Sequence, residues 1–483
     1  MNLAIRRRAQ EYEKELASLL PGYLEWIFNS RFYPDGILPI CFQAKDLRIG
    51  DSKILESGKA WRSTLKISPP DDRLTSKYFG VYHPDVLHDF LFELKSLDLL
   101  SLLKQSERIT SYSLPLPCRE SDKEDIRGIS DYLRLENDIC MDSHEYCLLI
   151  KLDVKHCYPS IYSHSIHWAI DGYENVRNEN ASTLTVDLNL SDSNGFRIDK
   201  LIQAMHGGLT KGLTIGPGAS DIIFEILFRK IDREISELFE KEKIDAYAAR
   251  YKDDYRIFVK DEKMKQNVID VVEKVLTKYL LHLNEEKTIV GNPFELLQRE
   301  WMVDYHSVAL NESREGTKKQ FLWHLARIAD LQRTYPYKRL LAKYLSNSRY
   351  LPKNKEDMRQ IASVLLSLSD CFHSVVPFCI SYIEKFVEKN KDVEVDKYIY
   401  SKAKNETNLY NAVWYLYYLS KYMKYYHKDF MQEMKGKFNN PFLLSIYNQT
   451  DQVFLDKKIS GAFYKPNLPG KIYDQTKKYA EIY

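Results

Sequence analysis

Two adjacent carboxylates, Asp253 and Asp254, separate two short segments that are rich in aromatic and β-branched residues, 246–251 and 255–259. Such segments favour strands. Asp also tolerates the tight turn between two antiparallel strands. We therefore expect a hairpin that carries both acids at its tip.

A third carboxylate, Asp153, ends the apolar run 147–152, which is typical of a buried central strand. Three carboxylates that converge suit two Mg²⁺ ions about 3.5–4 Å apart, because hard cations select carboxylate oxygens. Such ions clamp the attacking and leaving oxygens of nucleotidyl transfer. The pattern predicts a two-metal site at Asp153, Asp253 and Asp254. A pair of solvated turn acids is the alternative for Asp253 and Asp254.

Four motifs surround these acids, at 152–166, 212–220, 251–255 and 281–288. The first contains Tyr-Pro-Ser-Ile-Tyr and a His-Ser pair, the second is rich in glycine, the third is Tyr-Lys-Asp-Asp-Tyr, and the fourth ends in Lys-Thr. With these motifs the chain resembles the reverse transcriptases, and more narrowly the bacterial defence-associated group that includes the abortive-infection polymerases. The resemblance implies an RNA-directed DNA polymerase built from a palm and fingers.

Each motif also has a chemical task. The ring of Tyr158 is expected to press against the sugar of the incoming nucleotide and exclude a 2′-hydroxyl; a core aromatic residue is the alternative. Gly212 and Gly216 let the backbone approach a base pair closely. Lys287 is placed to meet the departing pyrophosphate, unless it is only a surface lysine. The expected substrate-binding residues are Tyr158, Gly212, Gly216, Pro217, Ser220 and Arg73.

Three positions depart from the motifs of the resembled group. Leu209 stands where a Gln is common, and Thr214 stands where a Pro is frequent. Lys252 occupies the variable position of the Asp-Asp motif, where a small or apolar residue commonly lies against the primer. We expect Lys252 either to pair with a phosphate or to point to solvent.

The residues that hold the triphosphate and the template are harder to identify upstream, because an isolated exposed arginine is more often a solvated surface residue. The candidates are Arg62, Arg73, Lys77, Arg108, Arg127 and Arg134.

The 483 residues are enough for two or three domains. After 292–293 the strand signals fade, and apolar residues at helical spacing recur from about 319 to 439. We predict an α+β fold in which a reverse-transcriptase palm and fingers precede an all-α helical-repeat domain. The predicted domains are N-terminal helices and fingers (1–145), palm (146–300) and helical repeats (301–483).

Composition excludes several classes of protein. The formal net charge is +2, which argues against a simple basic binder, although the end of the chain from residue 401 carries an excess of lysine. Seven cysteines show no paired metal spacing, and no apolar run is long enough for a membrane helix. We expect a reduced, cytoplasmic protein without a membrane partner.

Tyrosine is unusually frequent, with 35 copies. The cluster from 410 to 426 could stack on single-stranded bases, but we expect most of its rings to pack between helices. The chain ends with Tyr479 and Tyr483. Because some relatives start synthesis from a protein hydroxyl, these two residues are candidate priming tyrosines, with Tyr483 preferred.

By resemblance, the protein serves antiphage defence, uses two Mg²⁺ ions and deoxynucleoside triphosphates, binds RNA and its DNA product, and assembles as a homotrimer or homohexamer. Its template is expected to be an associated non-coding RNA. A template-independent, protein-primed polymerase of the abortive-infection type is the alternative. An inactive RNA-binding scaffold, an intron maturase and a retron enzyme fit the motifs less well.

Overall fold

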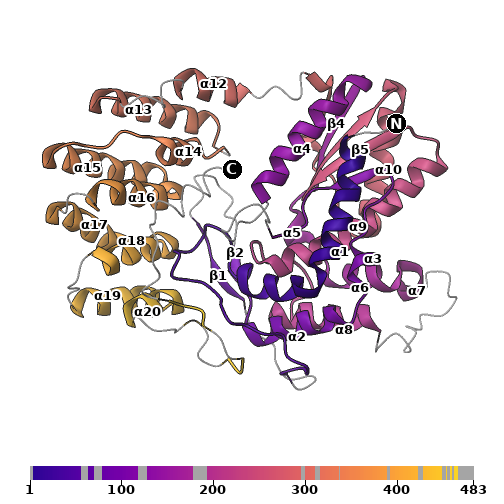
Figure 1. Cartoon of the computed structure of the whole chain (residues 1–483), viewed down its shortest axis with the longest axis horizontal. Coiled ribbons are helices and arrows are strands. Elements are labelled where there is room, and N and C mark those ends of the chain that lie inside the picture. The colour runs from indigo at the N-terminus through magenta and orange to yellow at the C-terminus, as the bar shows by residue number, and fades with distance from the viewer. Residues whose placement is uncertain are drawn as a thin grey trace.

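The computed structural model describes residues 4–55, 64–69, 79–117, 128–177, 193–294, 300–309, 316–336, 338–388, 392–422, 428–448, 453, 457–459 and 462–465. Figure 1 shows two groups of elements. A sheet and its covering helices occupy one side, and the helices that follow residue 300 occupy the other.

A five-stranded mixed sheet holds the three acids predicted to be functional. Its strand order is β3-β5-β6-β4-β7, in which β3 runs parallel to β5 and the other neighbours are antiparallel. The strands are β3 (Ile109–Ser111), β5 (Ala246–Tyr251), β6 (Asp254–Val259), β4 (Leu148–Asp153) and β7 (Ile289–Gly291). The apolar run that was expected to form a central strand is β4, and the expected hairpin is β5–β6. Both predictions are confirmed.

Helices cover both faces of this sheet. Alternate side chains of β5 and β6 point to opposite faces, as the two-residue period of a strand requires. Arg250 and Tyr255 contact α9 (Gly218–Lys241) through Asp232. On the other face, Arg256 pairs with Glu136 of α4 (Gly128–Asp142). The long first helix, α1 (Ala4–Ser30), packs against α4 and α9.

A buried ion network fixes α9 beneath the hairpin. The Arg250 guanidinium donates to Glu225 at 3.0 Å and to Asp232 at 2.8 Å, and all three side chains are fully buried. Removing one partner of such a network leaves a buried charge uncompensated, which costs several kcal/mol. The network therefore holds the hairpin tip in a fixed position over α9.

Shorter elements complete this half of the molecule. They are β1 (Leu65–Ile67), β2 (Phe79–Val81), α2 (Pro84–Lys95), α3 (Leu99–Leu102), α5 (Cys157–Ser160), α6 (Ser163–Asp171), α7 (Tyr173–Arg177), α8 (Asn194–Met205) and α10 (Lys265–Lys278). β1 and β2 pair as a separate two-stranded sheet, and α6 packs against α8 and α9.

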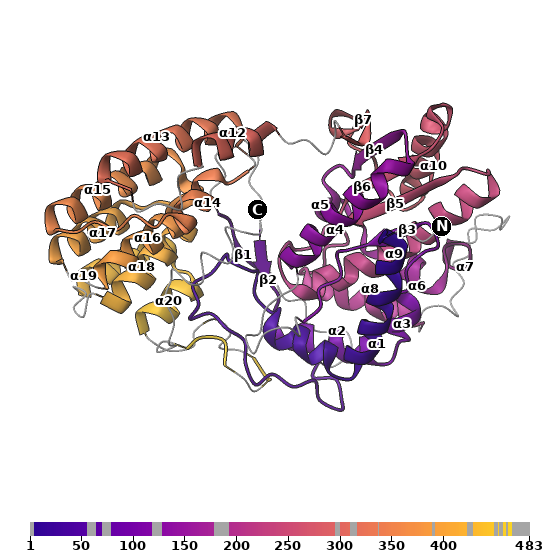
Figure 2. The same cartoon turned by 45° about the horizontal axis from the view of Figure 1, so that its top comes forward.

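Within the described residues of the second half of the molecule, the regular elements are helices. Its helices are α12 (Glu300–Ala309), α13 (Lys318–Thr334), α14 (Leu340–Asn347), α15 (Lys355–Cys371), α16 (Val376–Val387), α17 (Val393–Asn405), α18 (Leu409–Tyr422), α19 (Lys428–Phe438) and α20 (Pro441–Asn448). Figure 2 shows them stacked in chain order, with neighbours such as α13 and α14 or α17 and α18 in contact. That they form a sequence repeat, and that domains divide at 145 and 300, stay predictions.

The tyrosines of α18 are structural, as expected for most of the cluster. Tyr415 and Tyr418 are buried, and the Tyr418 hydroxyl donates to Asp396 at 3.1 Å. The Tyr422 hydroxyl donates to Glu384 at 2.6 Å. Tyr415 and Tyr418 therefore pack between helices, and Tyr422 is partly buried; Tyr425 and Tyr426 lie outside the described residues.

The two halves meet at the segment 31–47, which follows α1. The hydroxyl of Tyr33 donates to the carbonyl of Phe463 at 3.0 Å, and the indole N–H of Trp414 donates to the carbonyl of Ile37 at 3.2 Å. Lys45 exchanges backbone hydrogen bonds with Ala462. Elements from the two ends of the sequence therefore share one interface.

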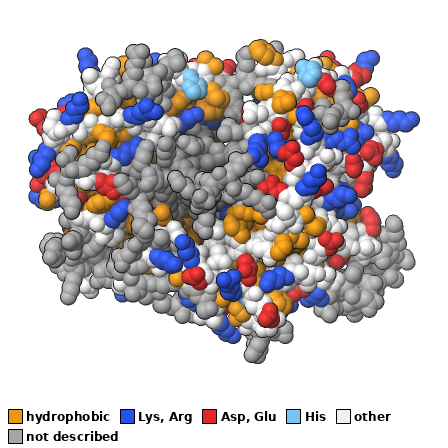
Figure 3. Space-filling model, in the orientation of Figure 1, with side chains coloured by type: hydrophobic (Ala, Val, Ile, Leu, Met, Phe, Trp, Pro, Cys, Tyr) orange, Lys and Arg blue, Asp and Glu red, His pale blue; other side chains and the backbone are white. Residues whose placement is uncertain are grey.

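Basic and acidic side chains of the described residues are interspersed on the face drawn in Figure 3, in keeping with the small net charge. No helix among the described residues is long and apolar enough to cross a membrane.

Candidate active site

The hairpin tip brings two of the three acids into direct register. A two-residue turn, Lys252 and Asp253, joins β5 to β6, and Lys252 has a φ of 55°. Asp254 is the first residue of β6 and lies directly opposite Asp153, the last residue of β4. Paired residues of antiparallel strands place their Cβ atoms about 4.5–5.5 Å apart on one face of the sheet. The two carboxylates therefore share one edge of the sheet, with Asp253 beside them.

The pKa values of Asp253 and Asp254 are both raised, by burial first and by nearby like charge. Burial, followed by the charges of Asp254 and Asp153, raises the pKa of Asp253 to about 6. Burial also raises the pKa of Asp254. Like charges disfavour each other's ionised form, and a cation relieves that cost. The negative charge of the three acids therefore needs nearby positive charge to balance it.

Lys287 supplies one cation. Its ammonium lies 3.0 and 3.2 Å from the two carboxylate oxygens of Asp153. Burial alone would lower the pKa of Lys287, but the hydrogen bond and the charge of Asp153 raise it overall. Asn284 donates to the same carboxylate at 3.3 Å. The structure thus brings Lys287 to the acids from the fourth motif, as the sequence predicts.

The expected convergence of three carboxylates is only partly present. Within the described part of the chain, no group of three or more His, Cys, Asp or Glu side chains is arranged to hold a metal ion. The donor chemistry nevertheless fits a hard divalent cation, because only carboxylate oxygens are offered and their charge is poorly balanced. The residues suit the ions, while the closed three-carboxylate arrangement that we expected is not preformed.

Tyr158 belongs to α5 and packs against the N-terminal part of α9. Its ring stacks on Phe224, with centroids 5.0 Å apart and an interplanar angle of 5°. Its hydroxyl donates to Asp221 at 2.7 Å. The Lys252 ammonium contacts the same carboxylate and lies 3.3 Å from the phenol oxygen. Lys252 does not point to solvent, because Asp221 binds it; that it pairs with a phosphate stays a prediction.

The glycine-rich motif forms a loop directly before α9. Gly212 and Gly216 have φ values of 96° and 114°, which side chains other than glycine rarely adopt. The loop is tied to the Tyr158 segment, because the Leu213 amide donates to the Tyr158 carbonyl at 2.8 Å. A Cβ added at Gly216 would lie 2.5 Å from the Cβ of Pro34. Glycine is therefore required both for backbone shape and for contact with the segment 31–47.

Pro217 and Ser220 are placed differently from the glycines. Pro217 is buried at the N-cap of α9. Ser220 is fully buried, and its hydroxyl is 2.7 Å from the hydroxyl of Tyr82. Tyr82 also contacts the ring of His206 at 3.2 Å and accepts from the Thr214 amide at 3.3 Å. Ser220 thus supports the loop through Tyr82, and it would act on a substrate only through the position of that loop.

The ring of His206 makes this support sensitive to acid. Burial, with a smaller contribution from Lys66, lowers the pKa of His206 from 6.5 to about 4. The folded protein then resists a proton that the unfolded chain accepts, so stability is complete above about pH 6.5 and falls between there and about pH 4. We expect a loss of about 2–3 kcal/mol of unfolding free energy from this residue across that interval.

Chemical denaturation at several pH values tests this expectation. The variant His206→Gln should lack this part of the acid-dependent loss, whereas His373→Gln, at an exposed position, should behave as the wild type does. Equal pH dependence in His206→Gln and in the wild type would contradict it.

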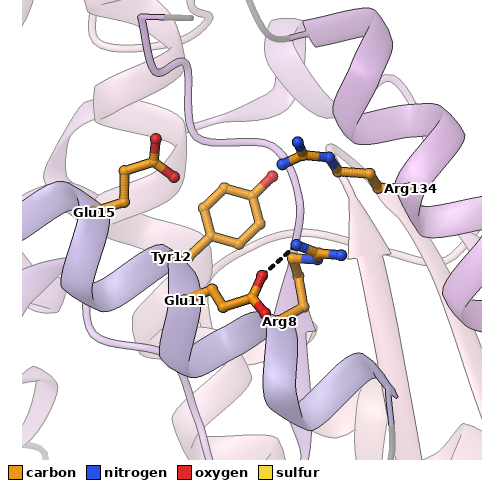
Figure 4. Close-up of a pocket in the computed structure, with 5 residues that line it drawn as sticks. All are labelled: Arg8, Glu11, Tyr12, Glu15 and Arg134. Atoms are coloured by element: carbon orange, nitrogen blue, oxygen red, sulfur yellow. Dashed lines mark hydrogen bonds and ion pairs between the residues drawn. The ribbon is translucent and has the colours of Figure 1, made fainter. Parts of the chain in front are cut away.

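Two of the upstream candidate cations, Arg108 and Arg134, are described by the structure, and both lie away from the acids. The guanidinium of Arg108 donates to the carbonyl of Ile244, before β5, whereas the acids follow the other end of that strand. Arg134 lines a cavity of about 190 Å³ between α1 and α4, together with Arg8, Glu11, Tyr12 and Glu15 (Figure 4). None of the three acids lines this cavity. Arg62, Arg73, Lys77, Arg127, Tyr479 and Tyr483 lie outside the described residues.

Sequence reasoning missed the partners of the motif residues. Asp221, Tyr82 and Arg31 have no diagnostic spacing, since each meets the site only through the fold. Asp221 directly follows the glycine-rich motif, but nothing in its spacing to Lys252 or Tyr158 indicates a contact. Asn284, three residues before Lys287, could have been found as a second polar residue of the same motif.

Comparison with known proteins gives one family model that matches part of the chain, including the residues of this site. Residues 99–323 match the family model described as reverse transcriptase (RNA-dependent DNA polymerase). No curated protein matches the chain. Matches among solved structures include telomerases of two Candida species.

These structural matches are distant. A Candida albicans telomerase in complex with a fragment of telomeric RNA is 14% identical, with a TM-score of 0.23 and coverage of 60% of this chain and 53% of the telomerase. For a Candida tropicalis telomerase in a similar complex, the identity is 12%, the TM-score 0.31, and the coverage 82% and 65%. Apo telomerase from Candida tropicalis is 13% identical, with a TM-score of 0.34 and coverage of 91% of this chain and 74% of the telomerase. The chain thus spans about half to two thirds of the first two telomerases.

Proposed function

Because residues 99–323 carry a reverse transcriptase domain, we propose that the protein makes DNA by RNA-directed nucleotidyl transfer at Asp153, Asp253 and Asp254. The domain is that of an RNA-directed DNA polymerase, a nucleotidyltransferase. The observation that carries the proposal is the pairing of Asp153 with Asp254 at one edge of the sheet, with Lys287 bound to Asp153. All of these residues lie inside the matched range.

Two Mg²⁺ ions are the proposed cofactors. Reverse transcriptase domains generally use divalent metal ions, which activate the attacking hydroxyl and stabilise the leaving pyrophosphate. Asp153, Asp253 and Asp254 would hold them, since the pKa of Asp253 shows how poorly its charge is balanced without them. Lys287 would exchange its contact with Asp153 for one with the pyrophosphate oxygens, where it offsets developing negative charge.

The substrate is proposed to be a deoxynucleoside triphosphate. Tyr158, stacked on Phe224 and held by Asp221, would present its ring edge to C2′ of the sugar. Gly212 and Gly216 would let the loop backbone lie against the base pair, because their positive φ values give the loop a shape that other residues rarely adopt. Arg73 stays a proposed triphosphate contact, while Ser220 and Pro217 would shape the loop.

The biological setting is proposed from the four motifs of the sequence. The protein would act in antiphage defence in the cytoplasm, copy an associated non-coding RNA and assemble as a homotrimer or homohexamer. Template-independent synthesis is the alternative that the same site chemistry permits, because the acids act on the primer hydroxyl and the triphosphate irrespective of a template.

A primer-extension assay tests the polymerase proposal. Purified protein is given a labelled DNA primer on an RNA template, the four deoxynucleoside triphosphates and Mg²⁺, with matched reactions that contain chelator or lack template. Extension that requires Mg²⁺ and the RNA supports templated synthesis. Extension without template supports the alternative. No incorporation in any reaction, with the protein folded, contradicts the polymerase proposal.

Protein priming is a separate proposal that rests on Tyr483. Labelled product should then stay with denatured protein, and Tyr483→Phe should abolish this linkage while extension of an added primer continues. Tyr479→Phe is the matched control. If Tyr483→Phe still acquires covalent DNA, the priming hydroxyl lies elsewhere; if wild-type product is free of protein, priming from the protein is wrong.

A further inference from the structure

One carboxylate, Asp221, gathers side chains from three other parts of the fold. It accepts the phenol of Tyr158 from α5 at 2.7 Å and the ammonium of Lys252 from the hairpin turn. Arg31, which follows α1, lies 3.5 Å from its other oxygen. Asp221 itself is in the first turn of α9 and is only 7% exposed. A carboxylate this deeply placed needs such partners to offset the free-energy cost of its burial.

The two cations are not equivalent. Arg31 also pairs with Asp35, so its charge is shared between two carboxylates. Lys252 pairs with one acid among the residues that the structure describes, Asp221, and binds the same oxygen that accepts Tyr158. The backbone of Lys252 is fixed as well, because Arg250 donates to its carbonyl at 3.0 Å and its amide donates to Ser113. The turn thus presents this ammonium from a rigid base.

The same helix turn holds the Tyr158 ring by its face and its hydroxyl. Phe224 lies three residues after Asp221 and stacks on the ring, while Asp221 accepts the hydroxyl. Stacking alone permits the ring to slide, since aromatic pairs accept a range of offsets. The hydroxyl contact removes that freedom, provided that Asp221 itself cannot rotate.

We propose that Lys252 is a positioning residue for sugar selection: it fixes Asp221, which fixes the phenol of Tyr158 against the sugar of the incoming nucleotide. The proposal rests on the polymerase function proposed above and assigns Lys252 a task in it. Steric exclusion of a single hydroxyl depends on placement within about 1 Å, so a loosened ring discriminates less. Lys252 therefore acts without touching the nucleotide.

A direct contact between Lys252 and a primer or nucleotide phosphate is the competing role, and it has a different consequence. A phosphate contact serves ribonucleotides and deoxynucleotides alike. Its loss reduces kcat/KM for both by the same factor and leaves their ratio unchanged. Positioning of Tyr158 changes the ratio.

The experiment is a double-mutant cycle read as the ratio of kcat/KM for a ribonucleotide to that for the matching deoxynucleotide. Its variants are Lys252→Met, Lys252→Arg, Tyr158→Phe and the double variant Lys252→Met/Tyr158→Phe. Lys252→Met should raise the ratio about fivefold, and Tyr158→Phe should raise it similarly, since both break the link between Asp221 and the ring. The double variant should show no further rise, and Lys252→Arg should keep the wild-type ratio.

An unchanged ratio in Lys252→Met, or effects of Lys252→Met and Tyr158→Phe that multiply in the double variant, would overturn the proposal while leaving the polymerase function intact. Wild-type protein that incorporates no nucleotide would overturn the polymerase function and this inference with it. If Lys252→Met lowers the melting temperature, Lys252→Asn replaces it, because asparagine tolerates the positive φ of this position and its side chain is much shorter than that of lysine. The same criterion on the ratio then applies.

Discussion

Asp253→Asn is expected to reduce deoxynucleotide incorporation by about a thousandfold or more, because it removes a charge that a pair of divalent cations requires. The amide retains the size of the side chain and the turn, in which Lys252 and not residue 253 has the positive φ. It also removes a charge whose burial and repulsion by Asp254 and Asp153 raise the pKa of Asp253. The melting temperature should therefore stay constant or rise, so that activity and stability change in opposite directions.

The matched control lies at the other end of the same strand. Asp261→Asn replaces an exposed acid that accepts the Lys263 amide at 3.0 Å, and asparagine retains this acceptor. Single-turnover incorporation by Asp261→Asn should equal that of the wild type. Near-normal incorporation by Asp253→Asn would rule out the metal assignment for this residue.

Tyr158→Ala should raise the ratio of ribonucleotide to deoxynucleotide incorporation by about a hundredfold, because the whole ring that opposes the 2′-hydroxyl is lost. Deoxynucleotide incorporation should fall much less, since the acids and Lys287 stay in place. The lost contact with Phe224 should also lower the unfolding free energy by about 2 kcal/mol. The measurement is kcat/KM for each nucleotide on one primer.

Tyr247→Ala controls for the loss of a half-buried ring. Tyr247 lies on β5 away from the hairpin tip, where it contacts Arg108. It should lower stability without changing the nucleotide ratio. An unchanged ratio in an active Tyr158→Ala variant would make Tyr158 a residue of the core alone.

The local parts of the site could be predicted from sequence because they depend on neighbours in the chain. The hairpin required only two strand-forming segments around a turn, and β4 required only an apolar run that ends in an acid. Lys287 followed from a motif. Packing of Tyr415 and Tyr418 between helices was also predictable, since apolar residues flank both in a helical pattern.

The contacts that fix these residues could not be predicted, since they join elements distant in sequence. Lys252 was expected at a phosphate or in solvent, yet it forms an ion pair with Asp221 of α9, the helix that packs beneath the hairpin. Ser220 was expected at the substrate, yet Tyr82 binds it from the chain before α2. The distance in sequence between the two residues of each pair predicts neither contact, because the packing of α9 under the sheet decides which side chains meet.

The segment 31–47 also bears on how the chain can be divided. Its first residues support the loop before α9, through the Arg31 carbonyl and the Pro34 ring, while Tyr33, Ile37 and Lys45 bind the helical half. A cut near residue 300 separates the sequence but leaves this interface exposed on both fragments. The halves are therefore not interchangeable modules: a helical half grafted from another protein would have to reproduce the surface that meets 31–47, or the glycine loop would lose its support.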